Sequence, residues 1–482
     1  MSSPRIKVGL LTFSDGRKYI HEDLLEVNWR YQNAVTAALE RTGEVEVVAG
    51  RDIIWTPELA RNEARRLAQD GCQLTIFNYA IWAFPHLTAI ASKFAPGPFL
   101  LFCNLNPSEP GMVAMLSAAG TMDQLGLPYG RVWGSIEDSA VLRRVMSFVR
   151  AAGALARLKG QTYGLFGGRP LGMYTAVANL DQWNSIFGVD VEHIEQYDVV
   201  RYAERVEASR VENALVWLEK HVGEIKYDGK ALTPEKLKAQ IRSYHAFQMI
   251  IEERQLDFVG TKAHGDLTDW FVTMDVAEAF LNDPYDWEGP HEPVVAATEA
   301  DMDGALTMQI LKLLSGEPVL FADIRHYDAA DDVWYFANSG THATYFARRS
   351  WDPEENLKKV TFWPEVSYYP AGGASVQYFA CEGPMTMARL ARKSGRYWLA
   401  IVPCDFVEYP LEVMKAKAAT TTPEWPHTFA RIPVPPDEFL SNYPCNHIHG
   451  VTGDWVDELL HIARILGIEA RVFDTSTRQE AR

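Results

Sequence analysis

The chain has few cysteines, and their spacing does not suggest a disulfide framework. Only five of its 482 residues are cysteines, at positions 72, 103, 381, 404 and 445, and no two of them form a CxxC pair. An odd number of scattered cysteines is typical of a protein from a reducing compartment. We therefore expect a cytoplasmic protein.

Long apolar runs and an excess of positive charge are also missing. No segment approaches the length that crosses a bilayer, and "MSSPRIKVGLLTFSDG" lacks the long apolar core and cleavage site of a signal peptide. The formal net charge is −17, from 46 basic and 63 acidic residues. Because binding to phosphate backbones or anionic membranes needs a basic surface, we expect neither nucleic acid nor membrane as a partner.

Several catalytic signatures are absent as well. "GLFGGRPLG" does not have the GxGxxG spacing, and the chain contains no GxxxxGK[ST], HExxH or GxSxG. "EADMDG" begins like a calcium-binding loop, but its twelfth position is Ile310, where a bidentate Glu is needed. The sequence thus gives no support to a nucleotide-binding protein, a hydrolase of these classes or an EF-hand.

Alternation of apolar runs with amphipathic stretches fills the first two thirds of the chain, and this pattern predicts an α/β fold. It runs through residues 1–155, restarts at "TYGLFGG" and continues to about residue 325. Beyond that point, short aromatic and β-branched runs are punctuated by Pro and Gly, as in "KVTFWPEVSYYP". We predict two Rossmann-like α/β domains, 1–155 and 156–325, followed by a β-rich, barrel-like C-terminal domain, 326–482.

Three carboxylates crowd the stretch "ATEADMDG", and they raise the question of what compensates their charge. Glu299, Asp301 and Asp303 stand within five positions and repel one another unless positive charge or water lies nearby. Glu299 closes the apolar run "EPVVAAT", and Asp323 closes "PVLFA". Because functional groups gather at the carboxyl ends of neighbouring strands, we expect these two acids to face one another.

A histidine could complete a metal site with these acids. "NYPCNHIHGVTGDW" offers His447 and His449 ahead of a predicted terminal helix. Oxygen ligands joined by one imidazole suit Mn²⁺, Co²⁺, Fe²⁺ or Mg²⁺. The pattern alone leaves the alternative open that the acids are helix caps and the histidines are exposed loop residues.

A longer stretch makes a family recognisable. "DVAEAFLNDPYDWEGPHEPVVAATEADMDGALTMQILKLLSGEPVLFADIRHY", together with "GPMTMARL" and the pair Asn446–His447, resembles the L-fucose isomerase family, relatives of L-arabinose isomerase. The resemblance is strongest from about 260 to 460. This chain is shorter than the best-known members, which indicates a compact member.

The resemblance implies a metal-dependent aldose–ketose isomerase. Such an enzyme would interconvert L-fucose and L-fuculose, or D-arabinose and D-ribulose, through a cis-enediol, with Mn²⁺ as the preferred ion. It also implies a homo-oligomer, commonly a hexamer, whose active sites lie between subunits. Two alternatives stay open at this point: a non-catalytic sugar-binding protein on the same scaffold, and an isomerase or epimerase for another aldose such as L-arabinose.

Roles for individual residues follow from the same resemblance. Glu299 and Asp323 take the places of the catalytic acids that also bind the metal, and His447 takes the place of the metal-binding histidine. His449 is then a supporting or structural residue, and Asp301 and Asp303 are helix N-terminal charges that the helix dipole stabilises. The expected substrate-binding residues are Arg17, Trp82 (reaching the sugar of a neighbouring subunit), Lys262, Tyr369, Asn442 and His264, where relatives usually carry Gln.

Overall fold

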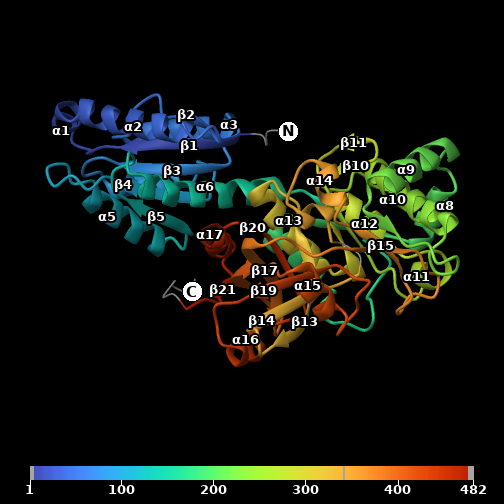
Figure 1. Cartoon of the computed structure of the whole chain (residues 1–482). Coiled ribbons are helices and arrows are strands. Elements are labelled where there is room, and N and C mark those ends of the chain that lie inside the picture. The colour runs from blue at the N-terminus through green and yellow to red at the C-terminus, as the bar shows by residue number, and fades with distance from the viewer. Residues whose placement is uncertain (1–4, 340–341, 476–482) are drawn as a thin grey trace. The chain divides into compact units, whose positions relative to one another are not determined.

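The computed structural model describes residues 5–339 and 342–475, which form two units (Figure 1). One unit comprises the chain up to Arg157 together with Asp457–Glu469. The other comprises Leu158–Val456 and the segment from Ala470 onward. Within the described ranges, no helix is both long and apolar enough to cross a membrane.

The first unit is a five-stranded parallel sheet with the strand order β2-β1-β3-β4-β5. Its inner strands are buried over nearly their whole length, which matches their continuous apolar runs. Two separate clusters of buried side chains show that helices cover both faces. The elements are β1 (Ile6–Phe13), β2 (Val45–Ala49), β3 (Leu74–Tyr79), β4 (Phe99–Cys103), β5 (Tyr129–Trp133), α1 (Lys18–Asp23), α2 (Leu25–Glu40), α3 (Pro57–Gln69), α4 (Pro85–Ala91), α5 (Gly111–Gln124), α6 (Ser139–Leu158) and α17 (Val456–Leu466).

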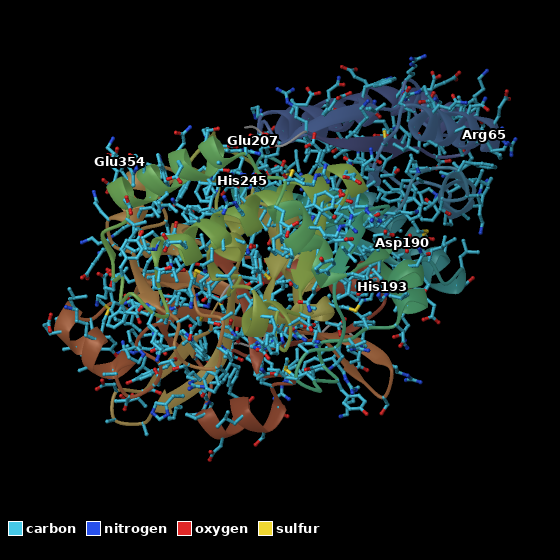
Figure 2. The ribbon with its side chains drawn as sticks, turned by 90° about the vertical axis from the view of Figure 1, so that its right-hand side faces the viewer. Arg65, Asp190, His193, Glu207, His245 and Glu354 are labelled. Carbon is cyan, nitrogen blue, oxygen red and sulfur yellow. The ribbon has the colours of Figure 1, made fainter. Side chains whose placement is uncertain are left out.

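A second parallel sheet begins the other unit, in the order β12-β9-β6-β7. Its longest helix, α10, starts where Thr233 caps the first turn and Pro234 follows, a combination that favours a helix start. Exposed acids such as Glu207 and Glu354 lie on the outside of this unit (Figure 2). The elements are β6 (Thr162–Phe166), β7 (Asp190–Ile194), β9 (Phe258–Thr261), β12 (Ala296–Ala297), α7 (Leu180–Gln182), η1 (Trp183–Phe187), α8 (Gln196–Ala203), α9 (Ala208–His221), α10 (Pro234–Arg254), α11 (Leu267–Trp270), α12 (Asp275–Asn282), η2 (Thr298–Ala300) and α13 (Met302–Ser315).

Antiparallel strands dominate the rest of the second unit. The order β17-β20-β13-β14-β19-β18 closes on itself because β17 also pairs with β18, and β21 adds to β18. The closed ring leaves few free strand edges. Its elements are β13 (Leu320–Asp328), β14 (Val333–Ala337), β17 (Gly383–Lys393), β18 (Arg396–Phe406), β19 (His427–Arg431), β20 (His447–Thr452), β21 (Glu469–Val472), α15 (Leu411–Ala418) and α16 (Pro436–Asn442).

Short elements complete the unit. They are β8 (Glu224–Ile225), β10 (Tyr285–Asp286), β11 (Gly289–Pro290), β15 (Thr361–Pro364), β16 (Ala374–Gln377), η3 (Thr344–Ala347) and α14 (Pro353–Leu357). The predicted fold class, parallel α/β sheets followed by a β-rich part, is confirmed. Strand β13 spans position 325, where we predicted a domain boundary.

A buried acid joins α12 to η3 inside the second unit. The Asp283 carboxylate accepts hydrogen bonds from Thr344 Oγ1 at 2.6 Å and from the Tyr345 backbone N–H at 2.8 Å. Its side chain is fully buried, and the burial raises the pKa of this carboxyl to about 7. The folded protein therefore holds a proton here that the unfolded chain releases near pH 4.

This raised pKa predicts a pH-dependent stability. Between about pH 4 and pH 7 the folded state binds the extra proton, so Asp283 should make the protein less stable as the pH rises through that window. Asp283→Asn removes the ionisable group while keeping its size. We expect the variant to gain stability relative to wild type at pH 8, by up to a few kcal/mol at roughly 1.4 kcal/mol per pKa unit, and by less than half of that at pH 5. Urea unfolding of both proteins at the two pH values measures this; a difference that does not change with pH would contradict it.

Candidate active site

The backbone around Glu299 makes an unusual turn. Strand β12 ends at Ala297, and the following turn η2 holds Glu299 at φ 55° and Ala300 at φ 46°. Both lie in the left-handed region that non-glycine residues rarely occupy, and such strain collects at functional sites. Asp301 then begins α13, where its side chain accepts a hydrogen bond from the Gly304 N–H at 3.0 Å. The turn thus places one acid at the strand end and the next at the helix N-cap.

Asp323 and His447 reach the same place from the barrel. They lie directly opposite one another in the antiparallel pair of β13 and β20. Our expectation that Glu299 and Asp323 close neighbouring strands of one α/β sheet is therefore wrong, because Glu299 follows the parallel sheet and Asp323 belongs to the barrel. The two acids still meet, since the end of the sheet and this barrel strand converge.

The three residues predicted as metal ligands form one cluster. His447 Nε2 lies 2.9 Å from Glu299 Oε2 and 3.5 Å from Asp323 Oδ1. The His447 side chain is 1% exposed, that of Glu299 13% and that of Asp323 25%. The cluster is therefore shielded from water on the histidine side and open on the side of the acids.

The electrostatics of the cluster favour positive charge. Burial tends to lower the pKa of His447, but the nearby carboxylates of Asp301 and Glu299 outweigh it and raise this pKa well above its ordinary value. Burial tends to raise the pKa of Glu299, yet the histidines His264 and His447 lower it to about 2. Burial raises the pKa of Asp323. The net result is an ionised glutamate beside an imidazole whose positively charged form is favoured.

The donor set fits a divalent cation. Glu299 Oε2 and His447 Nε2 are buried and lie 2.9 Å apart, and neither has a hydrogen-bond partner of suitable geometry among the described residues. Octahedral ligands about 2.1 Å from an ion lie roughly 3 Å from one another. A cation between these atoms would therefore satisfy both of them, and their chemistry suits Mn²⁺, Co²⁺, Fe²⁺ or Mg²⁺.

Both carboxylate oxygens of Asp323 accept hydrogen bonds from asparagine side chains. Its Oδ2 accepts a hydrogen bond from Asn338 Nδ2 at 2.7 Å, and its Oδ1 accepts one from Asn446 Nδ2 at 3.0 Å. Accordingly, no group of three His, Cys, Asp or Glu side chains within the described ranges could hold a metal ion as placed.

Two arginines compensate the other acids of "ATEADMDG". Arg389 on β17 is buried and pairs with Asp301, with Nη1 2.5 Å from Oδ2 and Nη2 3.0 Å from Oδ1. Arg392 Nε lies 2.8 Å from Asp303 Oδ2. The prediction that Asp301 and Asp303 stand at a helix N-terminus is confirmed. These arginines were not predicted from the sequence. "MARLAR" places them three positions apart on one strand, and this spacing does not indicate which acids they pair with.

His449 lies behind the cluster, in the supporting position that we predicted. It is fully buried, and its Nε2 is 3.1 Å from Arg389 Nη1. The Phe321 ring stands between the two histidines, with its centroid 4.7 Å from each imidazole. The barrel strands β13 and β20 thus supply both His447 and the packing that fixes it.

Two of the predicted substrate-binding residues adjoin the cluster. His264 Nε2 lies 3.4 Å from Glu299 Oε1. The ring of Tyr369 is 5.1 Å from the His264 ring, and its hydroxyl is 2.6 Å from Ser339 Oγ. His264 therefore contacts Glu299 directly, and Tyr369 packs against His264.

The other predicted residues of this unit have different surroundings. Lys262 Nζ pairs with Asp266 at 3.2 Å and lines a cavity of about 610 Å³ beside Gly167 and Trp270. Asn442 ends α16 and donates to the Glu438 carbonyl at 2.8 Å. The structure therefore does not bring these two residues to the acid cluster.

Arg17 and Trp82 belong to the first unit and follow two of its parallel strands. Arg17 comes after β1 and forms a bidentate pair with Asp15, at 2.9 Å and 2.7 Å. Trp82 comes after β3 and packs against the core of that unit. Both therefore stand at the carboxyl edge of the sheet, where ligand-binding residues gather in such folds.

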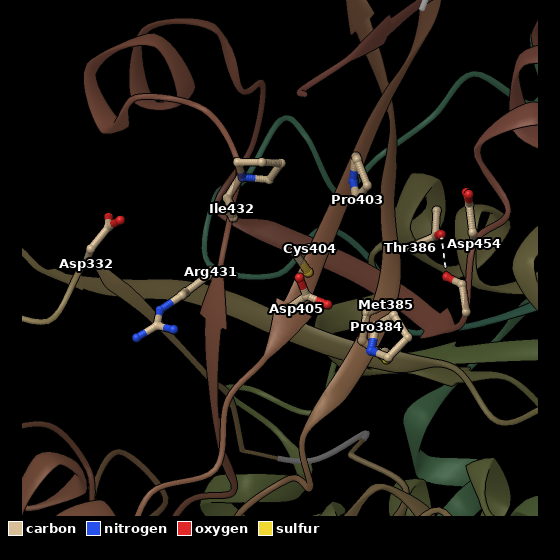
Figure 3. A pocket seen from close by; sticks show the side chains of 12 residues that line it. Asp332, Pro384, Met385, Thr386, Pro403, Cys404, Asp405, Arg431, Ile432 and Asp454 are labelled. Atoms are coloured by element: carbon tan, nitrogen blue, oxygen red, sulfur yellow. Dashed lines mark hydrogen bonds between the residues drawn. The ribbon is translucent and has the colours of Figure 1, made fainter. Parts of the chain in front are cut away.

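Another cavity, of about 390 Å³, opens on the barrel and contains none of the predicted residues (Figure 3). Thr386 Oγ1 donates a hydrogen bond to the Gly453 carbonyl at its edge. Cys404, Asp405 and Arg431 also line it. It lacks the paired acids and imidazole of the cluster around Glu299.

Comparisons with known proteins point to one family. Three family models match the chain: "L-fucose isomerase, first N-terminal domain" over residues 5–160, "second N-terminal domain" over 256–316 and "C-terminal domain" over 336–473. An L-fucose isomerase of Vibrio vulnificus is 24% identical over 96% of this chain and 92% of its own length. L-fucose isomerases of Haemophilus influenzae (25%; 99% and 94%) and Bacteroides thetaiotaomicron (24%; 88% and 84%) are similar over comparable spans.

The fold, the acid and imidazole cluster and these matches define an enzyme of the aldose–ketose isomerase class. The three models cover most of the chain in the order in which its domains occur. The chain belongs to the L-fucose isomerase family.

Proposed function

We propose that the protein is a metal-dependent isomerase that interconverts L-fucose and L-fuculose, or D-arabinose and D-ribulose. The observation that carries the proposal is the convergence of Glu299, Asp323 and His447, with Glu299 Oε2 and His447 Nε2 buried and 2.9 Å apart. The relatives carry the name L-fucose isomerase, which supports the choice of sugar.

Glu299, Asp323 and His447 would hold the cation, with Mn²⁺ as the favoured ion. When bound, the ion stabilises the negative charge that develops on the sugar oxygens as the C2 proton leaves. Glu299 and Asp323 flank C1 and C2; one removes a proton and the other returns it, so that the sugar passes through a cis-enediol. Two acids serve because the reaction is reversible and each alternates between acid and base.

The test uses metal-stripped protein in D₂O with L-fucose, D-arabinose and L-arabinose, with and without Mn²⁺. NMR follows ketose formation and deuterium at C1 or C2. Ketose that forms only with the metal and carries deuterium supports the proposal and names the sugar. Sugar binding without turnover across the panel would instead favour the non-catalytic sugar-binding alternative.

His264 offers a test of sugar recognition beside Glu299. The family resemblance implies Gln at this position, and a Gln side chain is both a hydrogen-bond donor and an acceptor, without a titratable ring. We expect His264→Gln to keep kcat within roughly tenfold, because Glu299 stays in place, while KM and the preference among aldoses change. Steady-state kinetics on the sugar panel measure this. Unchanged KM values for every sugar would remove His264 from the binding site.

We also infer a homo-oligomer, with Trp82 contributing to the active site of a neighbouring subunit. The resemblance to the family supports this assignment, and the position of Trp82 at the sheet edge is compatible with it. Light scattering during turnover measures it: full activity as a monomer would remove the role of Trp82 between subunits.

A further inference from the structure

The Nδ1 edge of the His447 ring, which points away from Glu299 and Asp323, contacts one buried carboxylate, that of Asp301. His447 Nδ1 lies 2.6 Å from Asp301 Oδ2, and both side chains are almost completely buried. The two ring nitrogens therefore have different partners, Asp301 on one side and the acid cluster on the other.

Asp301 has no freedom to turn away. Arg389 donates from Nη1 to Oδ2 at 2.5 Å and from Nη2 to Oδ1 at 3.0 Å, and the Gly304 N–H donates to Oδ1 at 3.0 Å. A carboxylate that receives these donors is itself only an acceptor. The proton shared between Asp301 and His447 must therefore lie on Nδ1, which leaves Nε2 to face Glu299.

We propose that Asp301, clamped by Arg389, is the positioning residue that fixes the ring orientation of His447 and keeps a proton on Nδ1, so that Nε2 is presented to the cation. The inference rests on the cation-binding role in the proposed function. It differs from the ligand assignment because Asp301 acts through His447 alone. Partners of this kind fix the tautomer and orientation of a metal-binding histidine.

Asp303 provides a matched control within the same helix turn. It is as deeply buried as Asp301 and has its own arginine, Arg392, with further hydrogen bonds from Tyr397 and Trp183. None of these three partners is His447. Loss of its charge should therefore lower stability without altering the ring of His447.

The experiment compares Asp301→Asn with Asp303→Asn in the metal-stripped full-length protein. In Asp301→Asn, Arg389 and the Gly304 N–H claim the amide oxygen, so the amide NH₂ faces Nδ1 and the ring must carry its proton on Nε2 instead. We expect Mn²⁺ binding, measured by calorimetry, to weaken roughly 10 to 100-fold, with kcat partly restored at high Mn²⁺. Asp303→Asn should bind Mn²⁺ as wild type does.

A second measurement needs no turnover. In ¹⁵N-histidine-labelled protein, the Nδ1–H of His447 should give a slowly exchanging low-field proton signal in wild type and Asp303→Asn, and Asp301→Asn should lose it. Retention of the signal and of the Mn²⁺ affinity in Asp301→Asn would overturn the proposal. So would the absence of the signal in wild type.

Two other outcomes, misfolding of the variant and absence of Mn²⁺ binding, can be distinguished from failure of this proposal. If Asp301→Asn does not fold, the double variant Asp301→Asn/Arg389→Gln removes the uncompensated buried guanidinium, and the same two measurements apply to it. If wild type binds no Mn²⁺, the cation in the proposed function is contradicted, while the Nδ1–H signal still decides whether Asp301 orients His447.

Discussion

Glu299→Gln is expected to leave a folded protein whose turnover falls by several orders of magnitude. Gln keeps the size of the side chain, but it cannot carry a proton and is a weaker ligand than a carboxylate. Loss of proton transfer alone costs about 10²- to 10⁴-fold, and Glu299 Oε2 is also the atom closest to His447 Nε2, at 2.9 Å. Initial rates of ketose formation at saturating sugar and Mn²⁺ measure the effect.

The matched control is Glu292→Gln, which makes the same change seven residues earlier in the chain. Glu292 is exposed and pairs with Lys312 on the surface. Circular dichroism and unfolding curves should be alike for both variants, and Glu292→Gln should keep wild-type turnover. Activity in Glu299→Gln above about a tenth of wild type would remove this residue from the proton transfer.

His447→Ala is expected to act mainly on metal affinity. It removes Nε2 from the cluster but leaves the Asp301–Arg389 pair intact, so the buried charges behind it stay compensated. We expect Mn²⁺ affinity to fall roughly 10 to 100-fold or more, by comparison with the loss of supporting residues at metal sites. Excess Mn²⁺ should restore part of the rate, which a titration of activity against Mn²⁺ would show.

His193→Ala is the control for this variant. His193 is an exposed residue of β7 in the same unit (Figure 2). Its loss should change neither Mn²⁺ affinity nor rate. If His447→Ala shows no recovery at any Mn²⁺ concentration, or binds Mn²⁺ as tightly as wild type, His447 is not a ligand.

Local patterns in the sequence sufficed to predict much of the fold. The Thr233–Pro234 start of α10 and the apolar runs of β3 and β4 are signals that a few neighbouring residues carry. The pairing of Asp323 with His447 is of another kind, because it depends on two barrel strands that lie far apart in the chain. Periodicity predicts strands but not their partners, so the sequence placed Asp323 in the wrong sheet.

The site could be predicted only as far as its residue types. Resemblance identified the three clustered residues, and the structure brings them together as expected. The left-handed turn at Glu299 and Ala300 contains no glycine, so the sequence did not indicate it; the surrounding structure holds it in place. In the sequence Arg389 looks like an ordinary strand residue. Its role appears only in the structure, where β17 packs beside α13 and Arg389 is buried against Asp301. Both depend on tertiary packing rather than on local preference.

The return of α17 to the first unit limits how the chain can be divided. Arg150 Nη1 bonds Glu458 at 3.3 Å, and the Phe148 and His461 rings meet at 5.4 Å. The first unit is thus interrupted, with the whole catalytic unit inserted between α6 and α17. A fragment that stops at residue 157 would lack the α17 side chains, such as Ile465, that pack against its core. A truncation that removes α17 would likewise destabilise the amino-terminal sheet.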